Sequence, residues 1–198
     1  CSEVKGIAQG LEEKAMVEFL CQVESPGRTL AGMDNIERFD PSMPELKFLL
    51  AKEINKIEDW IFTPIILHPE IYGFSGFYDE EVGAMRVNVE NQQERLQSDI
   101  NYVGDLRKFI DKVITHEKQN DLNFWKITGA YLAFIQSDFT KARILLDGVV
   151  APETLSFSMQ MQYKTTEALV SIFEGEELTE RTRFDIYQLL TSRINFWG

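Results

Sequence analysis

The sequence predicts a mainly α-helical protein whose antiparallel helical hairpins stack as a short solenoid or bundle. Three observations point to this fold class. Apolar residues recur at three- and four-residue steps in several segments, helix-start signals precede these segments, and small residues gather where two of them meet at a tight turn. One irregular insertion interrupts this pattern and carries the signals of a small β-hairpin.

The composition fits one soluble helical domain over residues 1–198, of the usual size for a domain. Hydrophobic residues make up 44% and charged residues 26%, which excludes disordered and collagen-like classes. The net charge of −12 repels phosphate backbones, so no nucleic acid partner is predicted. No apolar run reaches the ~18 residues of a spanning helix, so no transmembrane segment is predicted either.

The first helix is expected within residues 1–20. Its apolar face has helical spacing and consists of Val4, Ile7, Ala8, Leu11, Ala15 and Phe19. The opposite face is acidic, and Ser25-Pro26-Gly27 ends the helix. A loop that contains Gly32 and Asp40 then leads to the next helix.

The second helix has a clear start signal. Ser42 stands three residues before Glu45, with Pro44 between them, which is the arrangement of a capping box. The apolar stripe that follows consists of Leu46, Leu49, Leu50, Ile54, Ile57 and Trp60.

Residues 61–89 form the irregular insertion. Prolines and glycines in this segment disfavour a regular helix, and residues 77–78 and 85–87 flank residues 79–83 as the strands of a hairpin would. A long non-helical insertion in a helical chain is typical of a functional loop or an interface.

A third helix completes the N-terminal part, residues 1–120. It is capped by Asn88 or Asn91 and runs to about Glu117. Its stripe consists of Leu96, Ile100, Val103, Leu106, Ile110, Val113 and Ile114.

Residues 121–198 are expected to form helical hairpins. Two helices meet at residues 136–138, where Asp138 caps the second one. The small residues Gly129, Ala130 and Ala133 let the two backbones approach closely.

A second pair of helices follows from internal similarity. A shift of 38 residues aligns Ala130 with Ala168 and preserves the pattern of side-chain sizes. In this second pair, Pro152 begins the first helix and Thr179 caps its partner.

Residues 130–146, with the pattern Phe139-x-x-Ala142-x-x-x-Leu146, resemble the tetratricopeptide repeat. The resemblance covers residues 121–198 and implies stacked hairpins with a groove in which a protein or peptide partner docks. The family's repeat has 34 residues, so the shift of 38 requires a longer connection. A generic array of antiparallel helical hairpins is the alternative.

The sequence therefore favours a non-catalytic binding or scaffold module. It indicates no catalytic residue, no metal site and no cofactor. His68 and His116 lie in different elements, and Ser75 lacks the spacing and the strand-turn-helix frame of a nucleophile elbow.

The alternative function is a carbohydrate-binding or small-molecule-binding protein, or a glycosidase-like enzyme, that uses residues 61–89. The aromatic stretch in this insertion resembles loops that line sugar-binding clefts in helical toroid glycosidases. Paired carboxylates of such an enzyme would come from Asp79, Glu80 or Glu81. The candidate ligand-binding residues are Tyr72, Phe74, Phe77, Tyr78 and Arg86.

Two cysteines, Cys1 and Cys21, are too few for a disulfide framework and favour two free thiols. A chain that opens at Cys1 resembles a mature bacterial lipoprotein. This resemblance implies a lipid anchor at Cys1 and a location at a bacterial membrane surface, whereas a cytoplasmic location is the alternative. The acidic surface, which includes Glu12, Glu13 and Glu174, favours solubility or attraction of a basic partner.

Overall fold

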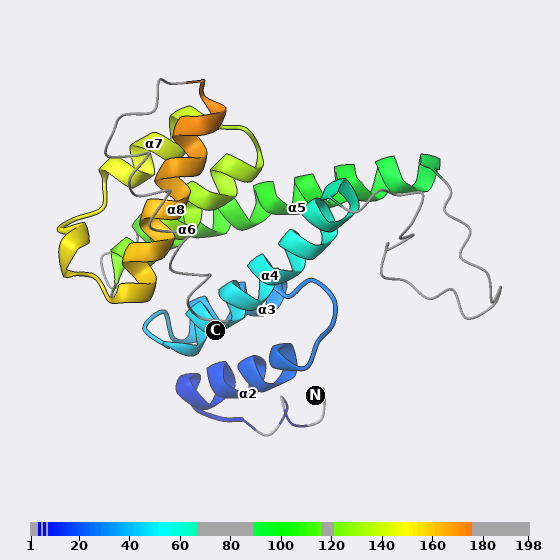
Figure 1. The fold of residues 1–198 in the computed structure, drawn as a ribbon. Coiled ribbons are helices and arrows are strands. Elements are labelled where there is room, and N and C mark those ends of the chain that lie inside the picture. Colours follow the sequence, from blue (N-terminus) through cyan, green and yellow to red (C-terminus); the bar gives the residue numbers. More distant parts are fainter. Residues whose placement is uncertain (1–3, 5, 7, 67–88, 116–120, 176–198) are drawn as a thin grey trace, which may run out of the picture. The chain divides into compact units, whose positions relative to one another are not determined.

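The computed structural model describes residues 4, 6, 8–66, 89–115 and 121–175. These residues are mainly helical, as predicted (Figure 1). The chain divides into two compact units, Cys1–Leu106 and Arg107–Gly198. The described α-helices are α2 (Leu11–Val23), α3 (Leu30–Phe39), α4 (Glu45–Ile66), α5 (Val89–Thr115), α6 (Leu122–Ile135), α7 (Phe139–Asp147) and α8 (Phe157–Phe173).

In the first unit, α2, α3 and α4 pack against one another. The α2–α3 contact is close, because a Cβ atom at Gly32 would lie 2.3 Å from the Gln22 side chain. Large apolar side chains with no more than 1% exposure fill the core of this unit: Met33, Ile36, Leu46, Leu49, Leu50, Ile57, Val103 and Leu106.

The expected buried face of the first helix is correct only in part. Ala8 and Ala15 are buried as expected, at 9% and 0% exposure, but Leu11 is 60% exposed and the acidic Glu18 is 4% exposed. The reason is the close approach of α3 at Gly32, which leaves room for small or extended side chains of α2 but not for its bulky ones. The helix also begins later than expected, at Leu11 after Gly10.

The segment between the first two predicted helices is a helix rather than a loop. This helix, α3, spans Leu30–Phe39 and buries Met33 and Ile36. Gly32 indicated a loop in the sequence, but in the structure it is the point of close approach to α2.

The long helix α4 begins at Glu45, three residues after the predicted cap Ser42. The predicted capping box is wrong, because the hydroxyl and the backbone N–H of Ser42 both donate to Asp40 Oδ1, at 2.7 and 3.0 Å, and not to Glu45. The helix also continues past Pro64 to Ile66, so residues 61–66 do not belong to an irregular insertion. A proline removes a single backbone hydrogen bond, and this helix tolerates that loss near its end. The expected hairpin within residues 67–88 lies outside the described residues.

Helix α5 begins at Val89 and ends at Thr115, close to the expected limits.

In the second unit, α6 packs on both α7 and α8. Helix α6 is buried along most of its length, as expected for a helix that is apolar all round. The predicted turn and cap are confirmed, because the Asp138 carboxylate accepts a hydrogen bond from Lys141 N.

The core of the second unit is built on small residues, as predicted. Ala130, Ala133 and Ala142 are fully buried together with Leu146 and Val170. The predicted start of the next helix at Pro152 is wrong. Residues Pro152–Thr154 form a separate 3-10 turn, and α8 begins at Phe157 with Ser156 as its cap.

Candidate functional site

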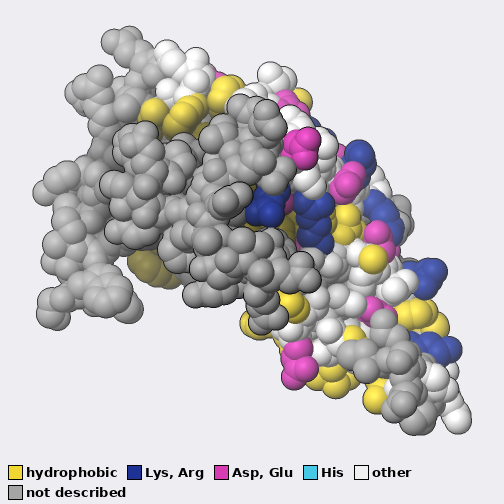
Figure 2. Space-filling model, turned by 90° about the vertical axis from the view of Figure 1, so that its right-hand side faces the viewer, with side chains coloured by type: hydrophobic (Ala, Val, Ile, Leu, Met, Phe, Trp, Pro, Cys, Tyr) yellow, Lys and Arg dark blue, Asp and Glu magenta, His cyan; other side chains and the backbone are white. Residues whose placement is uncertain are grey.

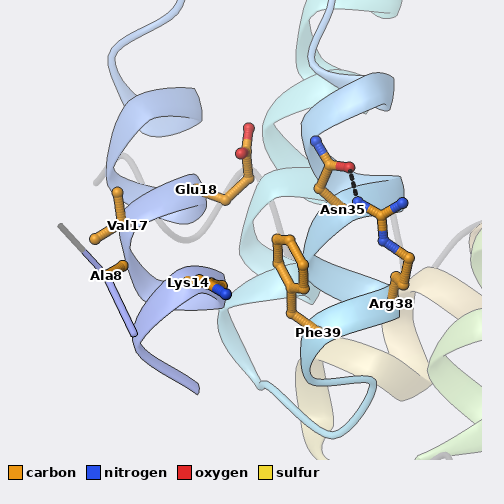
Figure 3. A pocket seen from close by; sticks show the side chains of 7 residues that line it. All are labelled: Ala8, Lys14, Val17, Glu18, Asn35, Arg38 and Phe39. Atoms are coloured by element: carbon orange, nitrogen blue, oxygen red, sulfur yellow. Dashed lines mark hydrogen bonds between the residues drawn. The ribbon is translucent and has the colours of Figure 1, made fainter. Parts of the chain in front are cut away.

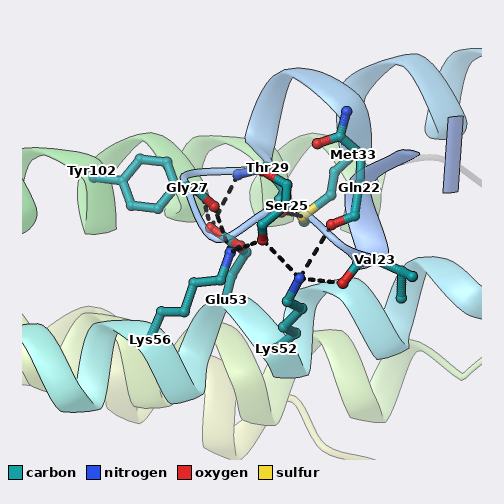
Figure 4. Close-up of polar contacts among 10 residues, drawn as sticks. All are labelled: Gln22, Val23, Ser25, Gly27, Thr29, Met33, Lys52, Glu53, Lys56 and Tyr102. Carbon is teal, nitrogen blue, oxygen red and sulfur yellow. Dashed lines mark hydrogen bonds and ion pairs between the residues drawn. The ribbon is translucent and has the colours of Figure 1, made fainter. Parts of the chain in front are cut away.

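A buried carboxylate, Glu53 of α4, organises the largest polar cluster described in the first unit (Figure 4). Glu53 is 0% exposed. It accepts hydrogen bonds from Thr29 N at 3.2 Å, from Lys56 Nζ at 2.6 Å and from the Tyr102 hydroxyl. Thr29 and Tyr102 connect α4 with the start of α3 and with α5, and the three donors together compensate for the cost of burying a charge.

Two lysines on the same side of α4 bind the end of α2 and the connection that follows it. Lys52 Nζ donates to the carbonyl oxygens of Gln22, Val23 and Ser25 at 3.2, 2.5 and 2.8 Å. Lys56 Nζ donates to Gly27 O at 2.5 Å. The Lys52 amine therefore meets the negative end of the α2 dipole, while the Glu53 carboxylate meets the positive end of the α3 dipole.

Arg28 adds a second connection to α5. Its guanidinium donates to Ser98 Oγ and to Asp99 Oδ1, both at 2.9 Å. The same guanidinium lies 4.7 Å from the centroid of the Tyr102 ring, a cation–π distance. The α2–α3 connection is thus attached to α4 and α5 from two sides.

The surroundings of this cluster shift two pKa values. Burial, followed by the hydrogen bond to Glu53, raises the pKa of Tyr102 far above its ordinary value of 10.0. Burial and the neighbouring Lys56 charge lower the pKa of Lys52. Because the lysine amines and the tyrosine hydroxyl donate to protein atoms, the cluster is suited to holding the α2–α3 connection rather than to proton transfer.

A small hollow opens between α2 and α3 (Figure 3). Its volume is about 320 Å³, at the lower end of the range for ligand pockets. The Phe39 ring lies between the two helices, and Asn35 Oδ1 accepts from Arg38 at 2.8 Å. The hollow is lined by Ala8, Lys14, Val17, Glu18, Asn35, Arg38 and Phe39.

Bulky apolar residues follow a half-buried to exposed face of α2. Met16, Phe19, Leu20 and Val23 have the i, i+3, i+4, i+7 spacing of one helix face, which we call the outer stripe of α2. Met16 is 41% and Leu20 55% exposed. The Phe19 ring meets the ring of Phe48, which is 57% exposed, edge to face at 6.2 Å. The outer stripe therefore continues onto α4.

In the second unit, exposed apolar side chains are spread over several elements. They include Ile144 of α7 at 62% and Phe173 of α8 at 62% exposure.

On the face seen in Figure 2, Lys and Arg side chains alternate with Asp and Glu, so this face shows no field of a single sign among its described residues.

The residues singled out in the insertion cannot be compared with this geometry. Tyr72, Phe74, Phe77, Tyr78 and Arg86 lie outside the described residues. The same holds for Asp79, Glu80, Glu81, His68, His116 and Cys1. Their proposed roles stay predictions.

The expectation of a free thiol at Cys21 is wrong, because Cys21 is disulfide-bonded. One sulfur atom cannot carry both a disulfide and a thioether-linked lipid. A lipid anchor at Cys1 and a disulfide that uses Cys1 therefore exclude each other.

Sequence reasoning missed Glu53 and Tyr102. A signal for Glu53 was present, since it follows Leu49 and Leu50 and precedes Ile57 at the spacing of the buried stripe of α4. A charged residue at such a position indicates a buried polar partner.

Within the described ranges, no helix is both long and apolar enough to cross a membrane. Nor does this part of the chain bring three or more His, Cys, Asp or Glu side chains together as metal ligands. Comparisons with protein-family models, curated proteins and solved structures gave no match.

Proposed function

We propose that this chain is a non-catalytic binding or scaffold module that holds a protein or peptide partner on its helices. The outer stripe of α2 carries this proposal. An ordinary surface helix turns its large apolar side chains inward. Helix α2 instead buries Ala15 and Glu18 and leaves Met16 and Leu20 at the surface.

The proposal includes the finer architecture. Helices α6 and α7 would be the first hairpin of a short tetratricopeptide-like stack, and α8 would begin the second hairpin. The burial of Ala130 and Ala168, at 0% and 6% exposure, supports this alignment. The turn at Asp138 supports it as well. Because α6 is enclosed, the partner would contact outer helix faces rather than a groove along α6.

A comparison of variants tests the binding function. The wild-type protein, Leu20→Gln and Ile144→Gln are immobilised, and proteins retained from an extract of the native host are identified by mass spectrometry. Ile144→Gln is the matched control, because Ile144 is similarly exposed but lies in the other unit. We expect partners retained by the wild type and by Ile144→Gln to be lost with Leu20→Gln. Identical sets for all three proteins would contradict the proposal.

The second candidate function is binding of a small molecule or carbohydrate. The hollow between α2 and α3 favours it, because Lys14, Arg38 and Asn35 offer polar groups beside the Phe39 ring. Residues 67–88 are the second place where such a ligand would bind. A thermal-shift screen against glycans and metabolites tests this function, since a ligand that binds the folded state raises Tm. A flat screen would contradict it.

A further inference from the structure

We propose that the outer stripe of α2 docks a basic amphipathic helix of a partner protein. This inference rests on the proposed binding function and names the chemistry of the partner. A helix that docks on a protein surface uses apolar anchors at i, i+3, i+4 and i+7. The outer stripe of α2 has the same spacing, so the anchors of a partner helix can pack along it.

The charges around the outer stripe point to a basic partner. Glu12, Glu13 and Glu24 are exposed and flank the apolar residues on the solvent side of α2. Lys14 is the cation of this helix, and it lies at the hollow on the α3 side. Lys52 of α4 reaches the end of the stripe at Val23, where the carbonyl oxygens of Gln22, Val23 and Ser25 hold its amine. An apolar stripe with an acidic rim complements lysine and arginine on the flanks of a partner helix.

Two other occupants are disfavoured by the same charges. A second copy of the chain would bring its own three glutamates against this rim, and each chain carries a net charge of −12. An anionic membrane surface would repel the rim in the same way. A basic helix is the occupant for which the apolar contacts and the charges act together.

Peptide titration tests the inference. The probe is a synthetic helix with leucine at i, i+3, i+4 and i+7 and lysine elsewhere. A second peptide has glutamate in place of lysine, and a third has the lysine peptide's composition in scrambled order. Leu20→Gln removes an apolar contact, and Glu12→Gln/Glu24→Gln removes two rim charges. The matched controls in the other unit are Ile144→Gln and Asp147→Asn/Glu153→Gln.

The expected result is binding of the lysine peptide that weakens about tenfold with Leu20→Gln and with the double glutamate variant, but not with the controls. Equal or tighter binding of the glutamate peptide through Leu20 would overturn the basic partner and leave the binding function standing. Binding that is insensitive to Leu20, or no binding, would overturn the docking site.

The other occupants are checked in parallel. Sedimentation equilibrium detects self-association, and flotation with phosphatidylcholine vesicles detects lipid binding. We expect neither to depend on Leu20. A dimer or a vesicle-bound fraction that is lost in Leu20→Gln would overturn the assignment of a basic helix to this surface.

Discussion

At the residue scale, Glu53 shows how a helical core accommodates a carboxylate. The side chain is fully buried, yet it faces a backbone N–H, an ammonium group and a hydroxyl. Removing one member of such a group leaves the others buried without a partner, which costs more than the net gain from the intact group. The cluster therefore makes Glu53 one of the α4 residues on which the α2–α3 connection depends, together with Lys52 and Lys56.

The change Glu53→Gln should lower the free energy of unfolding by about 3 kcal/mol, because the amide removes the charge that the Lys56 amine faces. Urea unfolding followed by circular dichroism measures the loss. Glu12→Gln, at an exposed site on α2, is the control and should stay within about 0.5 kcal/mol of the wild type. Equal losses for the two variants would show that the buried cluster contributes nothing.

Tyr102 should make stability depend on alkaline pH. Its folded-state pKa is raised above the ordinary 10.0, so the hydroxyl keeps its proton in the folded state while the unfolded chain loses it. The contribution of Tyr102 to the free energy of unfolding is therefore fully present below about pH 10 and is lost as the pH rises above that value. Urea midpoints from about pH 9 to 11 should fall more steeply for the wild type than for Tyr102→Phe. Parallel slopes would rule out this linkage.

At the element scale, sequence patterns located most helices and most of the buried faces of α4 and α5, but only part of the buried face of α2. The starts of α4 and α5 could be predicted to within a few residues, and the cap of α7 could be predicted because Asp138 acts through local backbone geometry. The rest of the face that α2 buries could not be predicted, because it depends on the approach of α3 at Gly32. The polar cluster was missed for the same reason, since its members are far apart in the sequence.

Asp138 has two functions at the start of α7, and two variants separate them. Its carboxylate accepts from Lys141 N at 3.2 Å and pairs with Arg107 at 2.5 Å. Asp138→Ala loses both interactions and should cost about 1 to 2 kcal/mol. Asp138→Asn keeps a capping oxygen and should cost less at neutral pH.

Acid titration provides the check on this prediction. The hydrogen bond from Arg107 holds the pKa of Asp138 below its ordinary 3.8. Its contribution is therefore present above that value and is lost as the pH falls through the lower folded-state pKa. The stability difference between the wild type and Asp138→Asn should shrink below about pH 4. A difference that stays constant in acid would exclude the charge pair.

Ala130 tests the packing of α6. This residue is fully buried, and a Cβ atom on the adjacent Gly129 would lie 3.1 Å from Ile110 and 3.2 Å from Leu145. Ala130→Leu should overpack this contact and cost about 1 to 3 kcal/mol in urea unfolding. The control is Ala51→Leu at an exposed position of α4, which should be nearly neutral. If the repeat alignment holds, Ala168→Leu should behave like Ala130→Leu, and a neutral Ala168→Leu would contradict it.

At the scale of the whole molecule, the net charge and the surface act together. The chain carries −12 at neutral pH, while the face in Figure 2 mixes both signs. The long-range field thus attracts a basic partner from a distance, whereas specific docking depends on a local arrangement such as the outer stripe and its acidic rim. Long-range attraction is screened by salt, but buried apolar contact is not.

This separation predicts how salt changes the kinetics of peptide binding. Raising the salt concentration from about 0.05 to about 0.5 M should slow association of the lysine peptide at least severalfold and change its dissociation rate much less, as measured by stopped-flow fluorescence. Glu12→Gln/Glu24→Gln should reduce the salt dependence of association, because two charges nearest the docked helix are gone. Leu20→Gln should leave that salt dependence intact and speed dissociation, because it removes contact area and no charge. A salt effect mainly on the dissociation rate would mean that charge holds the bound peptide. That result, or slower association with Leu20→Gln, would contradict the outer stripe as the docking surface.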